Sequence, residues 1–221
     1  RLMYGAKDGL PRLRRQRVFT IANQKGGVGK TTTSVNLACG LGFAGAKALL
    51  LDLDPQGNAT TGSGVEKNRL RHSIYDVLLR RRALAEVKIA CERGRYDLVP
   101  ANRELAGAEV ELVEVEERET RLKTALADVA GAYDFVLIDC PPALNLLTVN
   151  ALTAADAIVI PMQCEYYALE GLTDLVQTIR RVKANLNPSL QIEGLLRTMF
   201  DARNSLSLQV AAQLKEHFGD K

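Results

Sequence analysis

The sequence predicts an α/β fold in which a mostly parallel, twisted sheet is covered by helices on both faces. Apolar, strand-like runs alternate along the chain with segments of helical periodicity, which is the pattern of parallel sheets. The runs consist largely of Val, Ile, Leu and Ala, as expected of strands buried on both faces. The chain has 221 residues, 47% of them hydrophobic, which is enough for one well-packed domain.

The elements follow one another in a regular order. Apolar runs predict strands at residues 18–22, 48–53, 96–100, 135–138, 157–161 and 191–199. Amphipathic spacing predicts helices at residues 31–43, 73–80, 116–130, 146–154, 169–186 and 206–218. The pair Asn187-Pro188 should end the fifth helix, because the residue before a proline disfavours helical angles. The segment 57–68, rich in Gly, Thr, Ser and Asn, is expected to be a mobile loop beside a functional site.

Charge is distributed unevenly along the chain. Residues 1–17 contain six basic residues and a single acidic one, whereas the whole chain has a net charge of only +3. We interpret residues 1–17 as a flexible, solvated basic arm; salt-sensitive affinity for nucleic acid is the alternative. Residues 18–221 are expected to form one domain. The acidic and apolar segment 109–119 is interpreted as a solvated helix face.

Two classes of protein are disfavoured by composition. No apolar run approaches the roughly 18 residues of a membrane span, and no apolar stretch of a signal peptide precedes residue 18. We therefore expect a soluble, cytoplasmic protein. The four cysteines are far apart and form no Cys-x-x-Cys pair, so we expect reduced, mostly buried thiols rather than a zinc site. A cluster shared between two chains stays open. The cysteines are Cys39, Cys91, Cys140 and Cys164.

A glycine-rich loop stands between the first strand and the first helix. Residues 25–32 read Lys-Gly-Gly-Val-Gly-Lys-Thr-Thr, so that successive backbone N–H groups can surround a phosphate at the start of the helix. Lys30 is expected to reach the β- and γ-phosphates, and the hydroxyl of Thr31 to bind Mg²⁺. The predicted nucleotide-binding residues are Lys25, Gly26, Gly27, Val28, Gly29, Lys30, Thr31 and Thr32.

Carboxylates follow two of the predicted strands. Asp52 and Asp54 alternate along the end of the second strand, so both lie on one side at its carboxyl end, where open α/β sheets bind ligands. Asp139 ends the apolar run 135–138, as in a Walker B motif, and is expected to hold Mg²⁺ directly or through water.

The phosphate loop departs from the general Walker A pattern at two neighbouring positions. Gln24 occupies the place of the first glycine, and Lys25 adds a second lysine. This arrangement resembles the deviant Walker A motif of the ParA/MinD family of P-loop ATPases. The resemblance implies a P-loop NTPase fold of the SIMIBI type, with Mg·ATP as the cofactor. It implies that Lys25 reaches the phosphates of a partner subunit, and that Lys25, Lys30 and Asp54 are catalytic, Asp54 by orienting the attacking water. The role of Asp52 stays open.

Other runs resemble the ParA/Soj branch, which partitions chromosomes and plasmids. They lie at residues 100–102, 105–109, 162–172 and 199–203, and the resemblance covers residues 18–221. It implies an ATP-dependent homodimer that binds DNA non-specifically, associates with the nucleoid and is reset by hydrolysis when a ParB-type protein stimulates it. It places Arg203 on the DNA-binding face and predicts further chain after Lys221, including part of the adenine pocket, which Thr198 and Met199 would border.

Three alternatives stay open at this point. A MinD-like ATPase that acts at a membrane surface would need a C-terminal amphipathic helix. A ParA-like ATPase that positions another cargo would share every motif described above. A metabolic P-loop enzyme, such as a ligase similar to dethiobiotin synthase, would need a pocket for an acceptor substrate, for which we identify no residues.

Overall fold

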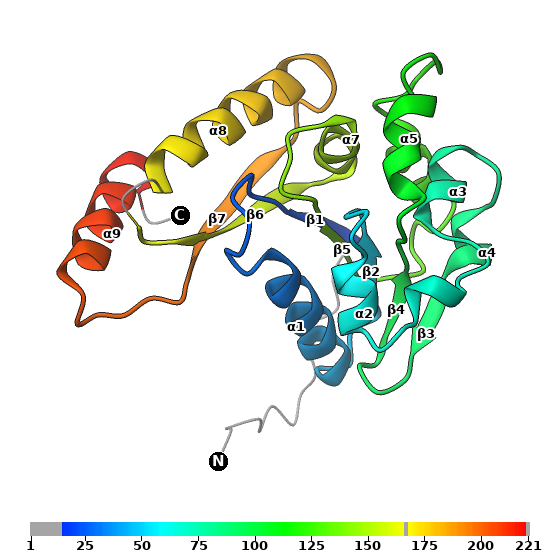
Figure 1. The fold of residues 1–221 in the computed structure, drawn as a ribbon, viewed down its shortest axis with the longest axis horizontal. Coiled ribbons are helices and arrows are strands. Elements are labelled where there is room, and N and C mark those ends of the chain that lie inside the picture. Colours follow the sequence, from blue (N-terminus) through cyan, green and yellow to red (C-terminus); the bar gives the residue numbers. More distant parts are fainter. Residues whose placement is uncertain (1–14, 166–167, 220–221) are drawn as a thin grey trace.

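The computed structural model describes residues 15–165 and 168–219 (Figure 1). Residues 1–14 of the predicted arm therefore lie outside the described residues, as do Tyr166, Tyr167 and Lys221. The described part of the arm is held against the sheet. The guanidinium of Arg15 lies 3.2 Å from the carboxylate of Asp156, and that of Arg17 lies 3.2 Å from Glu193.

In the part of the chain that the structure describes, seven strands form one sheet in the order β3-β4-β2-β5-β1-β6-β7. Every neighbouring pair is parallel except β3 and β4, so the predicted α/β fold with a mostly parallel sheet is confirmed. The edge strand β3 escaped prediction because three residues are too short to show a pattern. The strands are β1 (Arg17–Ile21), β2 (Ala48–Asp52), β3 (Ile89–Cys91), β4 (Tyr96–Val99), β5 (Phe135–Asp139), β6 (Ala157–Gln163) and β7 (Gln191–Thr198).

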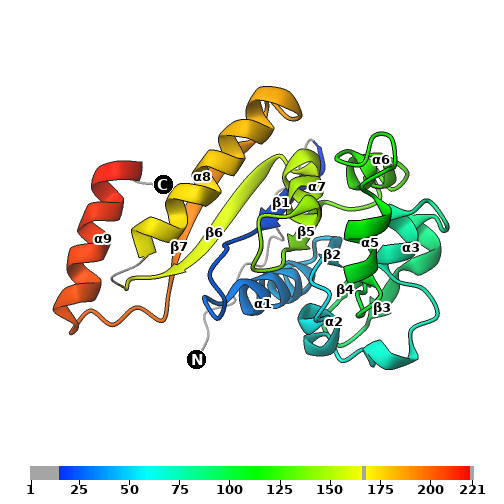
Figure 2. The ribbon, with the colours of Figure 1, turned by 45° about the horizontal axis from the view of Figure 1, so that its top comes forward.

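Helices cover both faces of this sheet, as predicted. Alternation along β2 divides the core: Leu50 packs with α1 and α2 on one face, whereas Leu49 and Leu51 pack with the other helices on the opposite face. Figures 1 and 2 show α1 across the strands from α7 and α8. The helices are α1 (Lys30–Phe43), α2 (Asn58–Gly62), α3 (Ile74–Leu78), α4 (Leu84–Val87), α5 (Leu105–Glu111), α6 (Arg121–Ala127), α7 (Leu146–Ala154), α8 (Ala168–Asn185) and α9 (Ser205–Phe218).

The structure corrects three of the predicted segments. Residues 57–68 are not a loop throughout, because they contain α2 and a 3₁₀ helix, Lys67–Arg69. The helix predicted at 116–130 is reduced to α6. The segment 109–119 is helical only to Glu111; Val110 and Val113 are exposed, in agreement with the predicted solvated face, whereas Leu112 is buried.

The predicted end of the fifth helix is confirmed, and a buried side chain explains it. Helix α8 ends at Asn185, before Pro188. The amide of Asn187 is buried and donates to the backbone oxygens of Leu152 and Ala155, at 3.0 and 2.7 Å. It thereby joins the end of α8 to the end of α7.

The thiol prediction also holds: in the described residues all four cysteines are free, and three are buried.

A close contact fixes the end of α1. A Cβ atom at Gly42 would lie 2.2 Å from the backbone oxygen of Arg95, in the turn between β3 and β4. The helix can approach this turn only because residue 42 has no side chain. At Gly40, two residues earlier in the same helix, a Cβ atom would meet nothing within 4 Å.

We expect Gly42→Ala to destabilise the protein by up to about 2 kcal/mol. The steric cost of overpacking, about 1–3 kcal/mol, should exceed the gain in helix propensity of about 1 kcal/mol. Gly40→Ala is the matched control and should stabilise the protein by up to about 1 kcal/mol, because only the propensity changes. Urea unfolding of both variants measures the difference. Equal effects of the two substitutions would contradict the proposed contact.

Candidate functional site

The glycine-rich loop lies at the carboxyl end of β1, between the ends of its neighbours β5 and β6. Gly27 and Gly29 have φ angles of 74° and 87°, a region that other residues rarely adopt. The loop is tied down at its entrance: the amide of Asn23 donates to the backbone oxygen of Pro161 at 2.8 Å, and its side-chain oxygen accepts from the backbone N–H of Lys25 at 3.0 Å. Its backbone is thus held open as a cradle before α1.

Lys30 is drawn into this cradle. Its side chain is buried, and its ammonium donates to the backbone oxygen of Lys25 at 2.9 Å. Burial lowers the pKa of Lys30, an effect that the nearby carboxylate of Asp139 opposes. A buried ammonium in a glycine-rich loop at the start of a helix is a site for an anion with several oxygens, as the sequence predicted for phosphates.

Asp139 ends β5 and receives hydrogen bonds from α1. One oxygen accepts from the hydroxyl of Thr31 at 2.8 Å, and the other accepts from Ser34 at 2.9 Å. The sequence analysis missed Ser34. Its position, three residues after Thr31, places both hydroxyls on one face of α1 and could have indicated it. Burial raises the pKa of Asp139 to about 7, and the charge of Asp52 contributes to this shift.

This donor set fits Mg²⁺. A carboxylate and a threonine hydroxyl are hard oxygen ligands, and Mg²⁺ usually takes only one or two of them and keeps several waters. A nearby cation would also favour the ionised form of the buried Asp139. The described residues contain no group of three or more His, Cys, Asp or Glu side chains that could hold a metal without such waters.

The two acids after β2 have different surroundings. Asp52 is fully buried, and one of its oxygens accepts from both the backbone N–H and the hydroxyl of Thr60, each at 2.7 Å. It therefore holds α2 against the sheet. Burial raises its pKa to about 6. Asp54 is also buried, but among the described residues its side chain binds only the backbone N–H of Gln56, at 2.9 Å.

Thr60 connects this cluster to the next strand. Its hydroxyl also accepts from the backbone N–H of Ala101, at 2.9 Å, just after β4. Gly57, at the start of α2, has a φ of 62° and lies so close to the same segment that a Cβ atom would be 2.8 Å from the oxygen of Ala101. These contacts fix the turn that carries Asp54.

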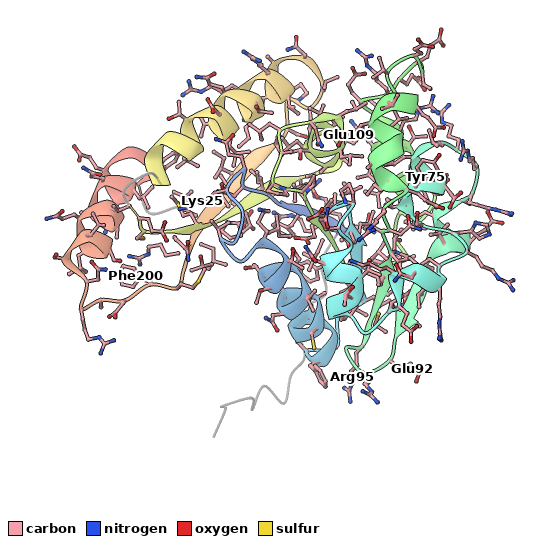
Figure 3. All side chains as sticks on the ribbon, in the orientation of Figure 1. Lys25, Tyr75, Glu92, Arg95, Glu109 and Phe200 are labelled. Carbon is pink, nitrogen blue, oxygen red and sulfur yellow. The ribbon has the colours of Figure 1, made fainter. Side chains whose placement is uncertain are left out.

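Lys25 lies at the rim of the loop (Figure 3). Its ammonium is 2.5 Å from a carboxylate oxygen of Glu165, and both side chains are partly exposed, at 39% and 53%. Gln24 reaches α8 nearby, where its amide donates to Asp174 at 3.3 Å. Within one chain, then, the second lysine of the motif is paired with an acid rather than directed into the cradle.

The residues predicted to border an adenine lie at the carboxyl end of β7, and Arg203 follows them in the chain. Arg203 is 90% exposed in the turn before α9, where its guanidinium makes two hydrogen bonds to Asp201, at 2.8 and 3.0 Å. The structure does not bring it to the phosphate loop. Thr198 does reach the loop, because its hydroxyl donates to the backbone oxygen of Val28 at 2.9 Å. Met199 is exposed.

Comparison with known proteins extends this description. The family described as "AAA domain" matches residues 16–192. The chromosome partitioning protein ParA of Caulobacter vibrioides is 52% identical over 207 residues, covering 93% of this chain and 78% of that protein. The sporulation initiation inhibitor protein Soj of Bacillus subtilis is 53% identical over 205 residues, covering 93% and 81%.

A solved structure is also similar. It is that of cobyrinic acid a,c-diamide synthase from Mycobacterium smegmatis with a bound ATP analog and magnesium. The TM-score is 0.88 at 40% identity, and the match covers 92% of this chain and 83% of the synthase chain.

In the described residues, no helix is long and apolar enough to cross a membrane.

We expect Thr60→Val to destabilise the protein by about 1–3 kcal/mol, because it keeps the shape of the side chain but removes the hydroxyl hydrogen bond to Asp52 and leaves the N–H of Ala101 without its acceptor. Urea unfolding followed by circular dichroism measures the change. Thr61→Val is the matched control, since Thr61 lies exposed on the same helix, and should change stability by less than about 0.5 kcal/mol. Similar losses in both variants would contradict the role given to Thr60.

Proposed function

The chain belongs to the ParA/Soj family of partition ATPases, and we propose that it segregates DNA in a cycle of ATP binding and hydrolysis. The observation that carries this proposal is the deviant loop itself, with Lys30 buried in the cradle and Lys25 held at its rim. In this cycle the ATP-bound form is a dimer on DNA, and hydrolysis returns it to a form that leaves DNA.

The residues present fit Mg·ATP. The synthase similar to this chain was solved with an ATP analog and magnesium, which supports the same cofactors here. When bound, Mg²⁺ neutralises charge on the transferred phosphate. Lys30 would bind the β- and γ-phosphates, the N–H groups of residues 26–32 would surround them, and Thr31 and Asp139 would hold the metal.

Asp54 is proposed to orient the attacking water. Its carboxylate lies at the same edge of the sheet as Asp139. The hydrogen bond from the backbone N–H of Gln56 fixes the orientation of this carboxylate. Phosphoryl transfer depends mainly on positioning and charge stabilisation, so a fixed carboxylate beside the γ-phosphate is sufficient for this role. Asp52 is proposed only to position it, because the backbone N–H of Asp54 donates to Asp52 at 3.1 Å.

We propose that, on dimerisation, Lys25 leaves Glu165 and binds the γ-phosphate held by the partner subunit. In the single chain its charge is satisfied by Glu165. An exposed pair of this kind contributes only about 0–1 kcal/mol, so a γ-phosphate of a partner subunit can compete for Lys25. The contact exists only with a triphosphate in the partner subunit, which couples dimerisation to the nucleotide state.

We propose that the ATP-bound dimer binds DNA and that its protein partner is of the ParB type. The relatives named ParA and Soj support this reading over a MinD-like role at membranes. Arg203 would contact phosphates without reading sequence, after leaving Asp201. The protein would then act in the cytoplasm on the nucleoid. A ParA-like ATPase that moves another cargo would use the same cycle.

A second candidate is an ATP-dependent ligase. The similarity to cobyrinic acid a,c-diamide synthase favours it specifically, at 40% identity over most of both chains. The 52–53% identity to ParA and Soj favours partition. The two functions make different demands. A ligase needs an acceptor molecule, whereas the partition cycle needs DNA binding that depends on the bound nucleotide.

We expect binding to random-sequence DNA to require ATP and to weaken steeply with salt, because phosphate contacts release counterions. Fluorescence anisotropy with ATP, ADP or no nucleotide, at several salt concentrations, measures this. Equal binding in all three states would contradict the proposed cycle and indicate that the basic arm acts alone. A variant without residues 1–14 is the control for that arm.

We expect Lys25→Ala to weaken ATP-dependent dimerisation about tenfold or more, because charge-assisted hydrogen bonds to phosphate are lost. Glu165→Gln should strengthen it, by up to about fivefold, because it releases Lys25 from its pair in the single chain. Light scattering with ATP measures both variants.

Lys183→Ala removes an exposed lysine near the end of α8 and serves as the control for this pair of substitutions. It should leave dimerisation unchanged. If Lys25→Ala dimerises as well as the unmodified protein, the role given to this lysine is wrong.

A further inference from the structure

A cavity of about 230 Å³ lies between the segment from α3 to α4 and one side of α6. Three arginines line it, Arg80, Arg82 and Arg121, together with a single acid, Asp128. The cavity is away from the phosphate loop: α3 and α4 (Figure 1) and α6 (Figure 2) lie beside the β3–β4 side of the sheet, whereas the loop follows β1. It therefore plays no part in the site described above.

Arg121 is the most unusual of these groups. Its side chain is only 8% exposed, and one guanidinium nitrogen donates to the backbone oxygen of Glu116 at 2.8 Å. Its Nε is buried and has no hydrogen-bond partner among the described residues. Burial lowers the pKa of Arg121, and the charge of Arg80 lowers it further. The charge of Glu117 opposes this lowering, but among the described residues no carboxylate forms an ion pair with Arg121.

Arg80 approaches the cavity from the end of α3. Its φ angle is 57°, and the N–H groups of Arg80 and Arg81 bind the oxygens of Val77 and Asp76 at 3.0 and 2.8 Å. This is the Schellman arrangement, in which the residue at position 80 is usually glycine. The chain places an arginine there despite the conformational cost, and so brings a guanidinium to the cavity.

Neighbouring acids balance part of this charge but leave hydrogen-bonding capacity on the arginines. Glu117 binds one nitrogen of Arg80 at 2.9 Å, and Glu86 lies 3.9 Å from Arg82, which is too long for a hydrogen bond. A guanidinium carries five N–H donors, so each arginine keeps capacity for a further acceptor. Within the lining itself, three positive charges face the one carboxylate of Asp128.

We propose that this cavity binds a small anion that carries a phosphate group. Arginine forks match the oxygens of phosphate and bind them in pairs, and a phosphate would supply acceptors for the N–H donors that Arg80 and Arg82 keep available. The concave shape suits one phosphate group rather than the extended backbone of a duplex. This site is independent of the proposed function and lies outside it.

Calorimetric titration with inorganic phosphate tests the proposal on the full chain saturated with Mg·ADP, so that the phosphate loop is already occupied. We expect one site, with affinity reduced about tenfold or more by Arg80→Gly. Glycine favours the left-handed angles at this position, so the same variant should keep or raise the melting temperature. Loss of binding therefore cannot be attributed to loss of fold. Arg82→Gln should also weaken phosphate binding.

Arg95→Gly is the matched control. Arg95 has a φ of 58°, almost the same as that of Arg80, but lies in the turn between β3 and β4 with its guanidinium over the ring of Phe43 (Figure 3). This substitution makes the same chemical and backbone change away from the cavity and should leave phosphate affinity unchanged. A titration with glycerol phosphate distinguishes the two sources of the anion: tighter binding than inorganic phosphate indicates a phosphate ester, and weaker binding indicates the free ion.

Three results would overturn the proposal. One is the absence of phosphate binding in the Mg·ADP-saturated protein. Another is equal affinity of the unmodified protein and Arg80→Gly. The third is displacement of bound phosphate by duplex DNA, which would assign the arginines to the nucleic-acid surface. Should Mg·ADP itself fail to bind, the nucleotide cycle is wrong, but the comparison of Arg80→Gly with Arg95→Gly still decides the anion site.

Discussion

Asp139 is fully buried at the end of β5, the central strand of the sheet, and both of its oxygens accept hydrogen bonds from α1. This contact sets where the helix begins relative to the sheet. The loop between β1 and α1 must then close over a short distance, which glycines with left-handed angles allow. The position of Lys30, and with it the whole cradle, follows from this one buried carboxylate.

At this edge of the sheet, burial shifts the pKa values of the lysine and of the carboxylates in opposite directions. Burial lowers the pKa of Lys30 and raises those of Asp52 and Asp139. Each group is therefore less stable in its charged form than it would be in water. A ligand that brings both an anion and a cation, as a metal–nucleotide does, stabilises the lysine and the carboxylates together. Such a site favours the complete ligand over either of its parts.

Much of the fold could be predicted because strands buried on both faces leave long apolar runs, as in β2 and β5. The wrong predictions concern segments whose secondary structure depends on contacts with neighbouring elements. Helix α2 forms within a Gly- and Thr-rich segment because buried Asp52 binds Thr60, and the sequence does not reveal that pairing. The start of α6 is similarly set by Asn150, whose oxygen accepts from the backbone N–H of Leu122 at 3.1 Å. Local propensity carries no information about such partners.

The sequence by itself determined the order of the elements, the phosphate loop and the acids that follow β2 and β5, because contiguous residues encode all three. Only the tertiary structure decided which partners those acids bind, that Ser34 joins Asp139, and that Lys25 is paired with Glu165 across 140 residues. It also brought Arg80 and Arg121 to one cavity from separate helices. The physical reason is the same in each case: burial and hydrogen bonding depend on neighbours in space, which packing of the sheet and helices assembles from distant parts of the chain.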